Sequence, residues 1–197
     1  MRRKHIGILF TLALAALTLP ATPRLHAQST AGAQNSENAA HTPAEVVDQL
    51  LTMVQKEMMS LAEAMPADKY DFAPTNGNFH GVRTFGEQIK HVIQANYGMF
   101  GAAASMQPSG MARVNSLKTK AEIVQALKDS FAFAHKAVAT LDEQNALEEV
   151  KPVDGINTRA GIMTFAIIHM NDHVGQLVEY VRMNGIIPPF SMPAPKK

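Results

Sequence analysis

A short signal for the start of a helix occurs three times in this sequence, at Thr42, Thr84 and Thr119, each followed three residues later by a glutamate. In such a capping box the threonine hydroxyl accepts a hydrogen bond from the third helical N–H, and the glutamate accepts one from the threonine N–H. Apolar residues then recur three and four positions apart, which is the period of one helix face. The pattern therefore constrains the chain to a largely helical fold.

A fourth helix is predicted from about Thr158 to Asn184. Gly185 suits a left-handed helix cap, and the prolines at 188 and 189 prevent the helix from continuing. The long connections 65–83 and 142–157 carry proline and glycine turn signals. Because no strand pattern is found, the sequence predicts an all-α fold, a four-helix bundle of one domain.

The domain organisation follows from composition along the 197 residues. Residues 1–27 read as a signal peptide, with a basic start, an apolar run and a cleavage signal at Leu25-His26-Ala27. An uncleaved anchor is the alternative, but the apolar run is shorter than the roughly 20 residues of a membrane-spanning helix. Residues 28–41 are predicted to form a flexible linker, 42–189 the bundle, and 190–197 a disordered C-terminal tail. We expect a periplasmic or secreted protein.

Charge and cysteine content exclude several kinds of function. Lysine and arginine total 18 against 17 for aspartate and glutamate, so we expect no nucleic-acid partner and no membrane association beyond export. The sequence has no cysteine, which removes disulfides, thiolate metal ligands and a cysteine nucleophile. Any metal site must therefore form without thiolate ligands.

Histidines supply the candidate site. His169 and His173 lie four residues apart on the predicted fourth helix, within its apolar stripe, so both imidazoles can bind one ion. His91, on the second helix, is a candidate third ligand, although it lies about 80° outside that helix's apolar stripe. A three-histidine site leaves a coordination position open for water or substrate. The alternative is that these histidines are hydrogen-bonded residues of the core.

Four segments together resemble one known family. They are the run from Met65 to Pro74, Thr84-Phe85-Gly86-Glu87-Gln88-Ile89-Lys90-His91, His169-Met170-Asn171-Asp172-His173-Val174-Gly175-Gln176, and the run from Tyr180 to Pro189. The pattern resembles the DinB-like family (DinB/YfiT-like bundles). The resemblance implies a four-helix bundle with His91, His169 and His173 as metal ligands, and related bundles often dimerise, so a homodimer is one expectation.

The same resemblance implies a function, namely a metal-dependent hydrolase, although some relatives are thiol transferases that activate a small thiol. A common family form has arginine directly after the last histidine, where this chain has Val174, which weakens any inference of an anionic substrate. A non-catalytic bundle that binds metal or a small ligand is the alternative, and a purely structural bundle is another. The substrate itself is not identified by the sequence.

Three further side chains are candidates for supporting the site. Asp172 and Gln176 flank the histidine pair and could orient the imidazoles. Glu87 lies one turn before His91 and could serve as a base, but its place in the capping box is the favoured explanation. The expected cofactor is a divalent metal ion, zinc or nickel before iron or copper, since imidazole accommodates all four.

Overall fold

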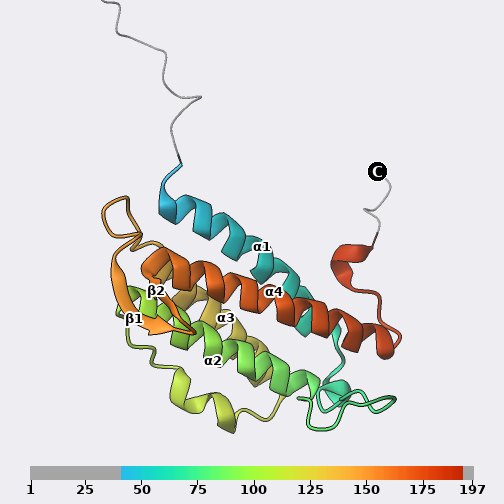
Figure 1. The fold of residues 1–197 in the computed structure, drawn as a ribbon. Coiled ribbons are helices and arrows are strands. Elements are labelled where there is room, and N and C mark those ends of the chain that lie inside the picture. Colours follow the sequence, from blue (N-terminus) through green and yellow to red (C-terminus); the bar gives the residue numbers. More distant parts are fainter. Residues whose placement is uncertain (1–40, 193–197) are drawn as a thin grey trace, which may run out of the picture. The chain divides into compact units, whose positions relative to one another are not determined.

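The structure, a computed structural model, describes residues 41–192. Within this range four long α-helices form a bundle: α1 (Pro43–Ala64), α2 (Phe85–Ala104), α3 (Lys120–Val138) and α4 (Arg159–Met183). Helix α2 packs against α3 and α4, and α1 packs against the same two helices (Figure 1). Their apolar faces enclose one core, in which Phe85, Phe100 and Phe131 are fully buried. The predicted helical bundle is thus confirmed.

All three predicted capping boxes are present. The hydroxyls of Thr42, Thr84 and Thr119 accept hydrogen bonds from the third helical N–H, and the paired glutamates accept from the threonine N–H groups. Helix α4 starts after Thr158 without a side-chain cap. Its end is also as predicted, since Gly185 follows with a φ of 73°, a left-handed conformation that costs glycine little.

A small antiparallel hairpin corrects the expectation that the chain has no strands. Strand β1 (Glu149–Val153) pairs with β2 (Ile156–Thr158). The two residues between them, Asp154 and Gly155, both have positive φ, 48° and 83°, which is the geometry of a tight hairpin turn. Val153 and Ile156 pack against the core, and this burial stabilises strands too short for an alternating pattern to reveal.

The ends of the predicted domains fall mostly outside the described residues. The signal peptide and the linker, except His41, lie in 1–40, and residues 193–197 of the tail lie outside as well. The tail was expected to begin at 190. Instead Phe190 belongs to a 3-10 helix, η3 (Pro189–Ser191), which packs against α1. The Phe190 side chain is 42% exposed. The folded chain therefore continues slightly beyond the predicted boundary.

The long connection between α1 and α2 is tied to both helices. After the 3-10 helix η1 (Ala67–Lys69), the hydroxyl of Tyr70 donates to the carbonyl of Ala62 at 2.6 Å. The carbonyl of Tyr70 accepts from the N–H of Gly86 at 2.8 Å. The two hydrogen bonds of Tyr70 fix where α2 begins, and therefore which of its side chains face α4. After α2, a second 3-10 helix, η2 (Met111–Ser116), packs on that helix.

Between residues 41 and 192, no helix combines the length and the apolar content that crossing a bilayer requires.

Candidate metal centre

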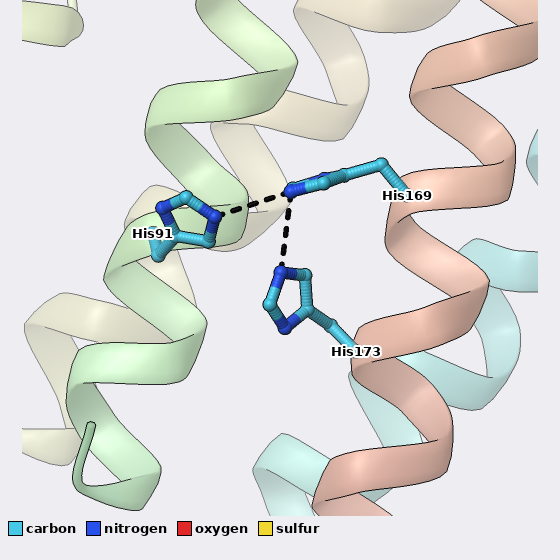
Figure 2. Close-up of side chains that lie close together, drawn as sticks. All are labelled: His91, His169 and His173. Carbon is cyan, nitrogen blue, oxygen red and sulfur yellow. Dashed lines mark hydrogen bonds between the residues drawn. The ribbon is translucent and has the colours of Figure 1, made fainter. Parts of the chain in front are cut away.

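Three histidine side chains meet between α2 and α4. His91 comes from the middle of α2, while His169 and His173 come from successive turns of α4 (Figure 2). The Nε2 atom of His169 lies 3.1 Å from Nε2 of His91 and 3.2 Å from Nε2 of His173. The structure therefore brings together the three residues predicted as ligands.

The spacing of these nitrogen atoms fits a single ion. Three nitrogens placed at about 2.0–2.1 Å from a tetrahedral metal are separated from one another by roughly 3.3–3.4 Å. The two measured separations, 3.1 and 3.2 Å, are close to this value. Among the described residues, this is the one group of three or more histidine or acidic side chains whose ligand atoms converge in this way.

Hydrogen bonding alone does not account for the contacts. An imidazole nitrogen carries either one hydrogen or one lone pair in the plane of the ring. Nε2 of His169 therefore makes at most one good hydrogen bond, yet it has two Nε2 neighbours. A cation that accepts one lone pair from each ring would satisfy all three nitrogens.

Burial keeps the three rings neutral. Burial, together with the neighbouring rings of His169 and His91, lowers the pKa of His173 to about 4. Burial also lowers the pKa of His91 and of His169, and the Arg83 cation acts in the same direction on both. Neutral imidazole is the form that binds metal, so near pH 7 the rings are ready to act as ligands.

The site lies at the edge of the core, not in its centre. The buried face of α4 is centred near Met170 and Leu177, and His173 is 5% exposed whereas His169 is half-buried. The prediction that both histidines lie within the core stripe is thus wrong for His169. His91 is half-buried on the flank of α2, as its position outside the apolar stripe predicted. The site therefore lies where the flanks of two helices meet, and two of its three imidazoles are partly exposed to solvent.

The three candidate supporting residues have different roles. Glu87 is the capping-box residue of α2, and its Oε2 accepts from the N–H of Thr84 at 2.8 Å. The hydrogen bond from Thr84 holds the pKa of this carboxyl below its usual value. Asp172 is exposed and accepts from Nε2 of Gln176 at 2.9 Å. Gln176 lies three residues after His173 on the same helix, so its amide is on the turn next to the His173 ring.

A fourth supporting residue, Gln88 on α2, was not predicted. Its Nε2 donates to Oε1 of Gln176 at 2.8 Å, which links α2 to α4 beside His173. The signal was present in the sequence, because Gln88 interrupts the apolar face that Phe85 and Val92 share.

Tyr180 links the two helices that carry the site. Its hydroxyl donates to the carbonyl of Arg83 at 2.9 Å and so joins α4 to the residue just before the N-cap of α2. Tyr180 is buried with its hydroxyl satisfied, as expected for a core tyrosine.

Another histidine, His135 on α3, belongs to a separate cluster. Its Nδ1 contacts Oδ1 of Asp48 at 2.5 Å, and its Nε2 contacts Oε1 of Gln55 at 2.6 Å. Both ring nitrogens are used in holding α3 against α1. His135 therefore serves as a control for experiments on the candidate metal centre.

Comparison with known proteins supplies the family. A family model described as the DinB superfamily matches residues 50–177. No curated protein matches the chain. Two similar solved structures are a DinB-like protein from Bacillus subtilis and a protein assigned to the DinB family from Exiguobacterium sibiricum.

The similarity to both structures is one of fold. The Bacillus subtilis protein is 18% identical with a TM-score of 0.56, and the match covers 76% of this chain and 98% of that one. The Exiguobacterium sibiricum protein is 14% identical with a TM-score of 0.58, and the match covers 80% of this chain and 99% of that one.

Proposed function

This chain belongs to the DinB superfamily, and from that premise we propose that it binds one divalent metal ion through His91, His169 and His173 and uses it in hydrolysis. The observation that carries the proposal is the convergence of three imidazoles from two helices, with Nε2 of His169 at 3.1 and 3.2 Å from the other two Nε2 atoms and one ligand nitrogen of each ring within 4.8 Å of the others. Zinc and nickel are the proposed ions because all three ligands are imidazoles.

The reaction would take place on the side of the site where His91 and His169 are partly exposed. A divalent ion held by three imidazoles leaves a coordination position at which it can polarise a carbonyl or lower the pKa of a water to about 7. The histidines hold the ion, and the core behind His173 excludes water from that side. Substrate would approach from the exposed flank of α2 and α4.

Metal binding without turnover is a second candidate, and a specific observation favours it. Hydrolysis usually needs a residue that accepts a proton near the metal. The two carboxylates closest in sequence to the ligands are engaged, Glu87 in the helix cap and Asp172 with Gln176. Bound water acting alone would then have to supply the nucleophile.

Hydrolytic activity is tested with the metal-loaded mature chain. We expect zinc- or nickel-loaded protein to hydrolyse at least one member of a panel of activated esters, anilides and phosphate esters. The rate should exceed that of a His169→Ala, His173→Ala variant by at least about a hundredfold, the lower end of the range for a single catalytic group. His135→Ala is the matched control that should keep the activity. Equal rates for all three proteins would leave metal binding without catalysis, and adding a small thiol to the same panel tests the thiol-transferase alternative.

We also propose export with removal of residues 1–27, on the basis of the basic start, apolar run and small-residue cleavage signal. Expression of the full chain in a bacterial host should give a periplasmic protein whose mass corresponds to a first residue of Gln28. Intact-mass measurement of the two cell fractions checks this. A full-length protein found only in the cytoplasm would refute the export proposal and leave the metal site untouched.

A further inference from the structure

Gln88 is a buried polar residue that packing does not explain. Its side chain is 5% exposed, and its Oε1 atom is fully buried without a hydrogen-bond partner. A buried acceptor without a partner costs free energy, whereas methionine, which is similar in length, would fill the same space without that cost. The retention of an amide here calls for a role other than packing.

The hydrogen bonds around Gln88 fix the orientation of two amides. An ionised carboxylate can only accept, so Asp172 determines that the NH₂ group of Gln176 faces it, at 2.9 Å. Oε1 of Gln176 must then face inward, where it accepts from Nε2 of Gln88 at 2.8 Å. The chain from Asp172 through Gln176 to Gln88 has a single consistent direction.

This chain of bonds ends beside His173. If Nε2 of His173 is to present its lone pair to a metal, Nδ1 must carry the hydrogen and needs an acceptor. Nδ1 is buried and has no hydrogen-bond partner, and Gln176 lies three residues further along α4, on the neighbouring turn. Oε1 of Gln176 has a second lone pair that is free to accept from Nδ1–H.

We propose that Gln88 is a positioning residue of the metal centre: it holds Oε1 of Gln176 as the acceptor for Nδ1–H of His173, and thereby keeps Nε2 of His173 directed at the ion. The inference rests on the proposed three-histidine site. Gln88 makes its hydrogen bond to Gln176 and none to the three histidines, and it takes no part in the reaction. Its effect on metal binding passes through Gln176 and the tautomer of His173.

The test compares two identical substitutions on α2. Gln88→Met removes the proposed interaction. Gln94→Met removes a similar hydrogen bond between two side-chain amides, from Nε2 of Gln94 to Oδ1 of Asn115 at 2.9 Å, which does not involve the histidines. Zinc affinity of the metal-free proteins is measured by competition with a chelator. We expect Gln88→Met to bind zinc about 10- to 100-fold more weakly than wild type, the usual effect of losing such support, and Gln94→Met to match wild type.

A second measurement separates positioning from packing. The denaturation midpoint of metal-free Gln88→Met should equal or exceed that of wild type, because the unpartnered Oε1 is gone. Nitrogen-15 shifts of metal-free wild type should show the Nδ1–H tautomer of His173, and Gln88→Met should shift it toward the other tautomer. This readout does not depend on metal.

The outcomes distinguish the two proposals. Unchanged zinc affinity in Gln88→Met, or weaker affinity with an equally lowered midpoint and an unchanged tautomer, would overturn the role of Gln88 while leaving the metal site intact. A folded wild type that binds no zinc would instead refute the proposed function.

Discussion

Replacing both α4 histidines by alanine is expected to lower zinc affinity by more than about a thousandfold, because zinc sites in proteins bind with roughly 10–16 kcal/mol and each ligand supplies a large share. His169 and His173 are two of the three converging ligands. The remaining ligand, His91, is a single imidazole on a half-exposed helix flank. Competition with a chelator measures the loss directly.

The size of this effect requires a control for general damage to the bundle. His135→Ala removes an imidazole that bonds Asp48 and Gln55 across α1 and α3, away from the converging ligands. We expect this variant to retain one equivalent of zinc. If the double variant binds zinc as tightly as wild type, the ion is held elsewhere in the chain.

The second large effect is a loss of stability in acid for the metal-free protein. The pKa of His173 is about 4 in the folded protein and 6.5 ordinarily. Below pH 6.5 the unfolded chain therefore takes up a proton that the folded protein does not, and the free energy of unfolding falls as the pH falls toward 4. Between pH 7 and pH 5 the expected loss from His173 alone is up to about 2 kcal/mol. His91 and His169 add to it in the same direction, since their pKa values are also lowered.

Above pH 5 the carboxylates of the helix caps contribute little to the pH dependence of the free energy of unfolding. Glu45, Glu87 and Glu122 have pKa values below the ordinary 4.5, so the stability they contribute is lost only at lower pH. Urea unfolding in the presence of a chelator, at pH 7, 6 and 5, measures how the free energy of unfolding changes with pH. The change should be smaller in His173→Leu than in wild type. An equal change in the two proteins would contradict the lowered pKa of His173.

The helices were predictable because their signals are local. Each capping box joins residues three apart, and the spacing of apolar residues reports one helix face without knowledge of any partner. The His169–His173 pair is likewise a local pattern, since residues four apart on a helix share a face.

The rest of the site depends on which face each helix presents to its neighbour in the packed bundle. Spacing alone placed His91 outside its apolar stripe, and only the packing of α2 on α4 shows that this flank faces His169 and His173. Gln88 was missed for the same reason, because its partner Gln176 is 88 residues away. The β1–β2 hairpin is not predictable in this way, because Asp-Gly is common in loops as well as in hairpins and the two strands are short.

The central claim is that one metal ion sits among the three Nε2 atoms, and X-ray absorption at the zinc edge tests it most directly. The protein is loaded with one equivalent of zinc without a metal-affinity tag. We predict three imidazole nitrogens at about 2.0–2.1 Å, with the remaining position filled by the oxygen of a water molecule. A spectrum with one imidazole or none, or one unchanged in the His169→Ala, His173→Ala variant, would contradict it.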